Sequence, residues 1–217
     1  MVDKQKVAMA VAEAFGVMIL VTAVYAMVAR TSFPLFAAIA AGLVVGGLVL
    51  SIGPKTGANV NPAITVGLWT IKKIETAKAV MYIIAQLLGG VAALYLIKYL
   101  VGQPLENISG KFDWKVLLSE GIGALVFGFG VASAVYQKYE GGKLAFAVGG
   151  SLTVGILVAS LASNAILNPA VAIGLNSWNW AYAVGPVLGS VVGMNLYMLL
   201  FTDVATAKKK APAKKKK

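Results

Sequence analysis

Two stretches of this sequence repeat one short motif: "GANVNPAITVGL" spans residues 57–68, and "ILNPAVAIGL" spans residues 166–175. Asn is a preferred N-cap residue, and Pro is favoured at the first helical position, where its missing N–H costs nothing. Each motif therefore predicts the start of a helix. The apolar run after each Asn has about 8–10 residues, roughly half of what a bilayer core requires. We expect two half-membrane helices, at residues 61–70 and 168–176, with the motif residues Asn61, Pro62, Ala63, Asn168, Pro169 and Ala170.

The composition is that of a membrane protein. Of the 217 residues, 59% are hydrophobic and only 12% are charged, whereas soluble domains carry about 25% charged residues. A bilayer core needs about 20 apolar residues per helix, and six windows meet this requirement. The fold class expected is therefore an all-α membrane protein with six transmembrane helices plus the two half-membrane helices. The six windows are residues 7–29, 35–52, 77–101, 115–136, 144–162 and 181–201.

Several kinds of chemistry are excluded by the residues that are missing. The chain has no Cys and no His, so thiol chemistry, disulfides and histidine metal ligands are ruled out. We expect no metal, no cofactor and no enzymatic activity. The net charge of +11 does not indicate nucleic-acid binding, because seven of the 19 basic residues lie in the final run "AKKKAPAKKKK". A low-complexity run of this kind predicts a disordered lysine-rich tail over residues 203–217.

The two halves of the chain repeat each other. Glu13 precedes Asn61 by 48 residues, and Glu120 precedes Asn168 by the same number. "QLLGG" at residues 86–90 and "PVLGS" at 186–190 match at a slightly shorter offset. Three spanning helices per copy is an odd number, so the copies must have opposite orientations, as in inverted-repeat membrane proteins. We expect an inverted 3+3 repeat, with one copy at residues 7–101 and the other at 115–202.

The distribution of charge predicts the orientation in the membrane. With six spans, one side of the membrane carries 15 of the 19 basic residues, including the N-terminus and the tail. Cytoplasmic loops are enriched in Lys and Arg. The pattern predicts a multi-pass protein of the cell membrane with both termini in the cytoplasm. Residues 1–6 and 203–217 would then be cytoplasmic, and the loop at residues 102–114 extracellular.

Two half-helices that enter from opposite faces would meet near the middle of the membrane. The side-chain oxygen of each capping Asn accepts hydrogen bonds from its own helix, which leaves the amide NH₂ as a donor. Each helix N-terminus carries about half a positive charge. A water or hydroxyl oxygen can accept hydrogen bonds at such a point, whereas a cation is repelled.

The sequence resembles the aquaporin or major intrinsic protein family. The resemblance rests on the paired Asn-Pro-Ala motifs, on "AEAFG" at residues 12–16 and on "SEGIG" at residues 119–123, and it covers residues 8–201. It implies an aquaporin-like right-handed bundle, a pore through each monomer and a homotetramer. It also implies that Glu13 and Glu120 give structural support to the loops before the half-helices.

The outer selectivity filter that the resemblance implies is unusual in this chain. Its four positions, counted from the motifs, are Ala41, Ile156, Ala165 and Val171. The family usually has an aromatic residue at the position of Ala41, and His or Gly at that of Ile156. At Val171, directly after the second motif, it typically has Arg. An Arg would add a positive charge and several hydrogen-bond donors, and Val offers neither. The filter is therefore predicted to be wide and apolar.

The function predicted is a passive transmembrane channel for water that also admits other small neutral solutes. One alternative is an aquaglyceroporin-like facilitator of glycerol, ammonia or similar solutes. From other classes, a closed-pore structural membrane protein, a weak ion channel and a secondary transporter stay open. The partners expected are water or a small neutral solute, the lipid bilayer and further copies of the chain, with no nucleic acid.

Overall fold

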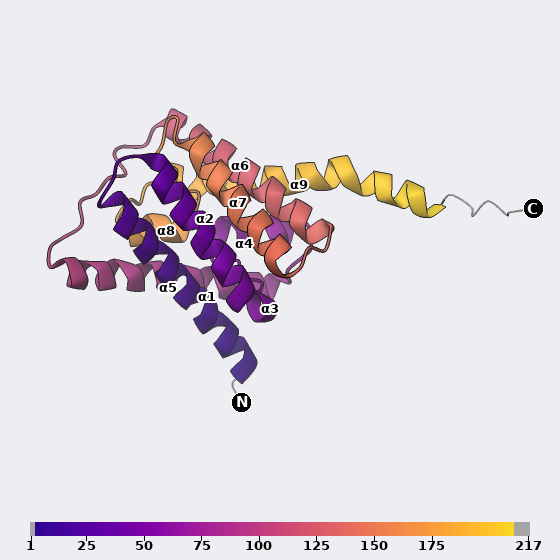
Figure 1. Cartoon of the computed structure of the whole chain (residues 1–217), viewed down its shortest axis with the longest axis horizontal. Coiled ribbons are helices and arrows are strands. Elements are labelled where there is room, and N and C mark those ends of the chain that lie inside the picture. Colours follow the sequence, from indigo (N-terminus) through magenta and orange to yellow (C-terminus); the bar gives the residue numbers. More distant parts are fainter. Residues whose placement is uncertain (1–2, 211–217) are drawn as a thin grey trace, which may run out of the picture.

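A computed structural model describes residues 3–210, with side chains described for residues 3–202. In this part of the chain every regular element is a helix (Figure 1). The elements are α1 (Lys4–Val28), α2 (Pro34–Ser51), α3 (Gly53–Thr56), α4 (Pro62–Thr70), α5 (Thr76–Val101), α6 (Trp114–Tyr136), α7 (Gly141–Ala159), α8 (Pro169–Gly174) and α9 (Trp180–Lys210).

The predicted fold class is confirmed. The six long helices α1, α2, α5, α6, α7 and α9 each contain a stretch that is long and apolar enough to cross a membrane. The short helices α4 and α8 begin at the proline of each motif, as expected. One element was not predicted: α3 is a single turn that starts with "GP" and ends at Gly57, whose φ of 98° suits glycine alone.

The C-terminal boundary differs from the prediction. The tail was expected to be disordered from residue 203, but α9 continues to Lys210. Residues 203–210 contain neither Pro nor Gly and consist largely of Ala and Lys, which are favourable residues in helices. Nothing local therefore ends the helix within residues 203–210. Residues 211–217 lie outside the described residues.

The packing of the helices follows the internal repeat. In the first half α1 packs on α2 and α5, and in the second half α6 packs on α7 and α9. The half-helices are exchanged between the halves, because α4 packs on α9 and α8 packs on α5. Figure 1 shows α4 and α8 between the long helices. Each half-helix thus packs mainly against a long helix of the opposite copy of the repeat.

The two halves also meet directly where α2 crosses α7. A Cβ atom added at Gly42 would lie 2.6 Å from the carbonyl oxygen of Gly149, and one added at Gly149 would clash with the carbonyl oxygen of Gly42. The two glycines hold equivalent positions in the two halves. Small residues permit this close approach of backbones, which is a common way of packing helices in membranes.

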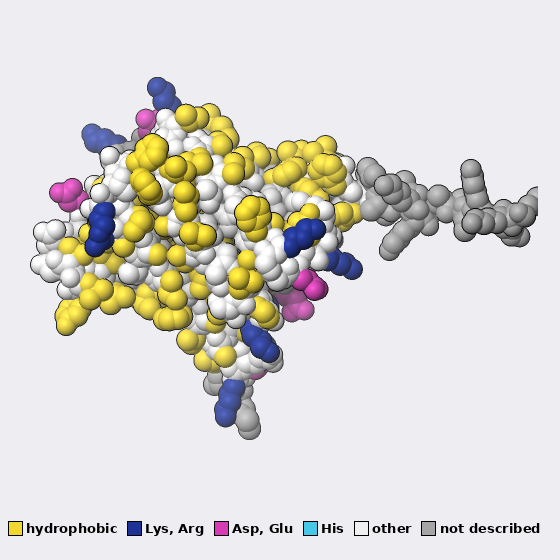
Figure 2. Space-filling model, in the orientation of Figure 1, with side chains coloured by type: hydrophobic (Ala, Val, Ile, Leu, Met, Phe, Trp, Pro, Cys, Tyr) yellow, Lys and Arg dark blue, Asp and Glu magenta, His cyan; other side chains and the backbone are white. Residues whose placement is uncertain are grey.

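The surface of the bundle is apolar. Large hydrophobic side chains such as Leu43, Phe146, Leu161 and Leu199 are more than 70% exposed. In Figure 2, hydrophobic side chains cover the visible sides of the bundle, and Lys, Arg, Asp and Glu lie toward its ends. A water-soluble protein rarely exposes an apolar area of this extent, whereas a bilayer core requires one.

Candidate functional site

The two Asn-Pro-Ala motifs lie against each other in the interior. Asn61 and Asn168 are the N-cap residues of α4 and α8, and their side-chain oxygens accept from the backbone N–H groups of Ala63 and Ala170 at 2.8 and 3.0 Å. These caps agree with the prediction. The amide nitrogens differ from it, because they are not wholly free. Each donates one hydrogen bond to the opposite repeat: Asn61 to Leu167 O and Asn168 to Val60 O, both at 2.9 Å. One N–H of each amide remains.

Glu13 holds the loop before α4. This carboxylate is fully buried in α1 and accepts from the backbone N–H groups of Asn59 at 3.1 Å and Val60 at 2.7 Å. It also accepts from the side-chain amide of Gln86 on α5 at 2.8 Å, and Gln86 in turn hydrogen-bonds to Thr65 of α4. A buried charge is tolerable only when it is well hydrogen-bonded, and these three donors meet that requirement.

Glu120 performs the same task before α8. It is fully buried in α6 and accepts from the backbone N–H groups of Ile166 at 2.9 Å and Leu167 at 2.7 Å. The third donor is the hydroxyl of Ser163 at 2.7 Å, in place of the Gln amide of the first repeat. Both carboxylates therefore accept hydrogen bonds from the backbone of the loops before the half-helices. Their role as structural support of these loops stays a prediction.

Both loops have an unusual backbone. Ala58 and Val60 have φ values of 50° and 41°, and their counterparts Ala165 and Leu167 have 53° and 52°. Left-handed conformations cost roughly 1–2 kcal/mol for residues with a Cβ atom, and for a β-branched residue such as Val60 they are rare. The same strained pattern occurs in both repeats. In each repeat the strained segment donates two backbone hydrogen bonds to a glutamate.

This backbone directs carbonyl groups away from the glutamates. Because the trans peptide unit is planar, an N–H and the carbonyl group before it point in opposite directions. The N–H groups of Ile166 and Leu167 point to Glu120, so the carbonyl groups of Ala165 and Ile166 point the other way. The same reasoning applies to the carbonyl groups of residues 58–59. Each loop thus offers two hydrogen-bond acceptors on the side opposite its carboxylate.

Two cavities lie on that side, at opposite ends of the bundle. We call the first the filter-side cavity. It has a volume of about 340 Å³ and is lined by both motif asparagines together with residues including Leu20, Ala165, Ile166 and Leu175. The second, the lysine-side cavity, has a volume of about 250 Å³ and is lined by residues including Ala58, Ile64, Lys73, Lys78 and Val131. Three residues line both cavities: Val45, Asn59 and Phe127.

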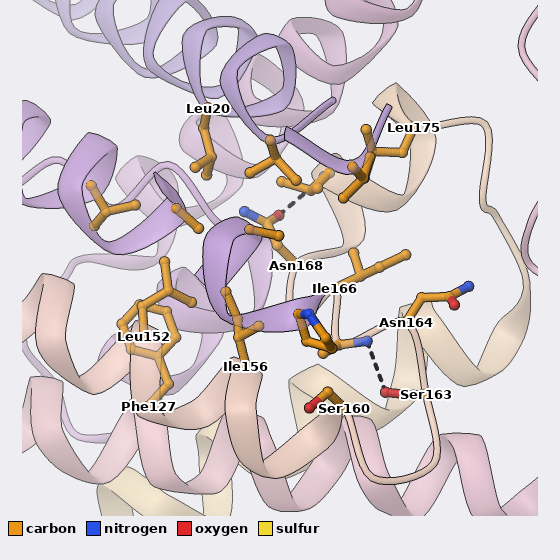
Figure 3. A pocket seen from close by; sticks show the side chains of 18 of the residues that line it. Leu20, Phe127, Leu152, Ile156, Ser160, Ser163, Asn164, Ile166, Asn168 and Leu175 are labelled. Atoms are coloured by element: carbon orange, nitrogen blue, oxygen red, sulfur yellow. Dashed lines mark hydrogen bonds between the residues drawn. The ribbon is translucent and has the colours of Figure 1, made fainter. Parts of the chain in front are cut away.

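All four predicted filter residues line the filter-side cavity. Ala41 comes from α2, Ile156 from α7, Ala165 from the loop before α8, and Val171 from α8 itself. All four are less than 10% exposed. Figure 3 shows Leu152 and Phe127 close together with Ile156 next to them, and Asn164 and Ser160 on the other side of Ile156. The structure thus brings the four residues to one place, and their role as a filter stays a prediction.

The loop between α5 and α6 covers part of the filter-side mouth. Ile108 of this loop lines the cavity. Three side chains of the second repeat, Asn164, Asn176 and Asn179, donate to backbone carbonyl groups within residues 105–109 at 2.8–2.9 Å. The loop is therefore attached at three points to the half that supplies α8.

Three contributors to this site were not identified from the sequence. Gln86 and Thr65 complete the hydrogen bonding around Glu13, and Phe127 lines both cavities. A signal for Gln86 was present, since an amide in the middle of an apolar span usually has a polar partner. Phe127 gave no signal, because an aromatic residue in a membrane helix faces lipid or protein equally well. Within residues 3–202 no group of three His, Cys, Asp or Glu side chains could hold a metal ion.

Comparisons with known proteins agree with this geometry. The chain is 29% identical over 187 residues to aquaporin AqpM of Methanothermobacter thermautotrophicus, with 76% of each chain covered. It is 32% identical over 181 residues to aquaporin-4 of Mus musculus, which covers 74% of this chain and 54% of that protein. The aquaglyceroporin of Plasmodium falciparum has the same fold, with a TM-score of 0.75, 22% identity, and coverage of 93% of this chain and 99% of that one. The family model described as "Major intrinsic protein" matches residues 2–197. The chain belongs to the major intrinsic protein family.

Proposed function

We propose that this protein is a passive channel that carries water and other small neutral solutes across a membrane. The observation that carries the proposal is that two cavities, toward opposite ends of the bundle, adjoin at the half-helices and share the lining residues Val45, Asn59 and Phe127. Similarity to aquaporins supports the same conclusion. Within the described residues the pore region offers no metal cluster, and both buried acids are used to hold backbone, so a coupled transporter is not favoured.

The polar groups along the path suit a neutral solute. In the filter-side cavity the carbonyl groups of Ala165 and Ile166 offer acceptors, and the motif asparagines each have one remaining amide N–H. A water or hydroxyl can therefore exchange some of its hydrogen bonds for new ones as it passes. The positive ends of the half-helices oppose a cation at the same point.

The filter residues set the size of the permeant. Ala41, Ile156, Ala165 and Val171 are all apolar, and two of the four are alanine. We propose that they leave an outer filter wide enough for solutes somewhat larger than water. Glycerol is the second candidate, and the structural similarity to an aquaglyceroporin favours including it in the first test.

The assembly and placement also belong to the proposal. The exposed apolar sides of the bundle are suited to lipid and to neighbouring copies, and we propose a homotetramer in the cell membrane. The excess of basic residues at the end that holds the N-terminus supports cytoplasmic N- and C-termini.

The test is stopped-flow light scattering on proteoliposomes. Osmotic steps in an impermeant sugar and in glycerol are compared for the wild type, Val171→Arg and Val171→Met. The Met variant is a size control, because it lengthens the side chain without charge. We expect fast entry of water and glycerol in the wild type and loss of glycerol entry with Arg. A wild-type protein that admits water only would contradict the wide filter, and one that admits neither would contradict the channel.

A further inference from the structure

The charged residues along the pore are unevenly distributed. The filter-side cavity is lined by no Lys, Arg, Asp or Glu. The lysine-side cavity is lined by two lysines, Lys73 and Lys78, and by no acidic residue. All charge on the described pore lining is therefore positive and lies at one end.

Both lysines are held near this mouth by the fold. Lys73 follows α4, and its backbone N–H donates to Leu68 O at 2.8 Å, which closes the turn after the half-helix. Lys78 lies in the first turns of α5, with its Nζ atom 5.2 Å from the ring centre of Tyr82. The hydroxyl of Tyr82 donates to Thr56 O at 2.8 Å, in the segment that leads to the first motif. The cation of Lys78 is thus tied to the wall of the pore.

Neither lysine forms an ion pair within the described residues. Among residues 3–202 the one ion pair within 4.0 Å joins Lys6 and Asp3, which are exposed at the start of α1. Glu75 lies between the two lysines in sequence and lines a separate surface pocket beside Lys73, but it does not line the lysine-side cavity. The rest of the lining is mostly apolar. A cleft with low-dielectric walls and charges of one sign concentrates the field of those charges.

We infer that Lys73 and Lys78 determine the charge selectivity of this channel, by creating a positive potential in the lysine-side cavity that excludes cations. The inference rests on the proposed function and extends it. It places the charge barrier at the opposite end of the pore from the apolar filter around Val171. Neutral solutes pass this mouth freely, small anions are attracted into it, and cations are turned back before they reach the half-helices.

The test measures the potential in the cavity directly. Because the chain has no cysteine, a single thiol can be placed at Val135, which lines the lysine-side cavity. The purified protein in lipid nanodiscs is treated with two methanethiosulfonate reagents of similar size, one cationic and one anionic. Modification rates are followed by mass spectrometry. The ratio of the anionic to the cationic rate is compared with and without the substitutions Lys73→Gln and Lys78→Gln.

A matched control removes the same two charges from side chains that do not line the cavity, with Lys72→Gln and Lys143→Gln. We expect the ratio to fall by about tenfold or more in the Lys73/Lys78 variant, since charges that line the same cavity as the thiol act through a medium of intermediate dielectric. The Lys72/Lys143 control variant is expected to change the ratio of the two modification rates by less than about twofold. A thiol at Val131, also on the cavity lining, provides a second position should the first variant fold poorly.

An unchanged ratio in the Lys73/Lys78 variant at both thiol positions would overturn the inference. So would an equal fall in the control, because the potential would then be a general property of this face. The ratio is obtained without any flux, so a failure of the proposed function would be seen separately, as a wild-type protein that conducts no water.

Discussion

Replacing Glu120 by Gln leaves the side chain almost the same size but changes one acceptor oxygen into a donor. In the wild type one carboxylate oxygen accepts from Ile166 N and the Ser163 hydroxyl, and the other accepts from Leu167 N. Whichever oxygen becomes NH₂, one buried backbone N–H loses its acceptor. A buried donor left unpaired costs about 1–3 kcal/mol, and the remaining bonds lose the strength that the charge gave them.

The free energy lost with this hydrogen bond is of the same size as the conformational strain energy of the loop before α8. Ala165 and Leu167 both have positive φ, at a cost of roughly 1–2 kcal/mol each. We therefore expect the Gln variant to populate loop conformations in which the carbonyl groups no longer line the cavity. The equilibrium constant between the native loop and these conformations should shift by at least about fivefold, since 1 kcal/mol corresponds to roughly that factor, and water permeability per protein should fall by more than about twofold. The midpoint of thermal unfolding should fall by about 4–8 °C, for a loss of about 2 kcal/mol.

The assay combines stopped-flow permeability with thermal unfolding of the same preparation. Glu13→Gln should lower the water permeability and the unfolding temperature in the same way as Glu120→Gln, because it also leaves one backbone N–H unpaired. Glu106→Gln is the matched control, since this carboxylate lies on the exposed loop and should change neither quantity. If Glu120→Gln conducts water within about twofold of the wild type and unfolds at the same temperature, the carboxylate is not what holds the loop.

Three further outcomes follow from the packing. Gly42→Ala should disrupt the α2–α7 crossing and lower the amount of folded protein, because its Cβ would lie 2.6 Å from Gly149 O. Gly47→Ala is the control: this position has open space around it, so the substitution should be neutral or stabilise the protein by up to about 1 kcal/mol. Fluorescence-detected gel filtration would distinguish the two variants. Asn176→Ala should speed hydrogen exchange in residues 102–113, because one of three attachments of that loop is lost, while water flux is retained. Ser190→Ala should not lower the unfolding temperature, because within residues 3–202 this hydroxyl is the one buried side-chain polar atom with no hydrogen-bond partner.

The long helices and the starts of the half-helices could be predicted because their causes are local. Length and hydropathy decide a membrane span, and an Asn-Pro pair decides a helix start wherever it stands. The exchange of α4 and α8 between the halves could not be predicted in the same way. It depends on contacts between residues far apart in the chain, such as the hydrogen bond from Asn61 to Leu167.

The left-handed loops are the clearest case of structure imposed from a distance. Val is a poor residue for positive φ, so nothing near Val60 indicates the conformation that it adopts. Its N–H is directed by Glu13, which lies 47 residues earlier in the chain. The sequence does link each glutamate to its motif, because Glu and Asn have the same spacing in the two halves. That spacing indicates that Glu13 and the first motif belong to one repeated unit, but it does not predict the backbone conformation of the loop between them.

The two repeats differ most where the pore meets solvent. Their interiors match closely, with one Glu, two left-handed residues and one capping Asn in each half. The cavity linings do not match, since one end is uncharged and the other carries Lys73 and Lys78. The interior is constrained because each half must satisfy buried backbone groups of the other. Side chains at the two mouths of the pore do not form the hydrogen bonds that hold the half-helices. The charge and the diameter of each mouth can therefore change without altering those hydrogen bonds. Selectivity is therefore expected to respond to substitutions at the mouths, and stability to substitutions in the interior.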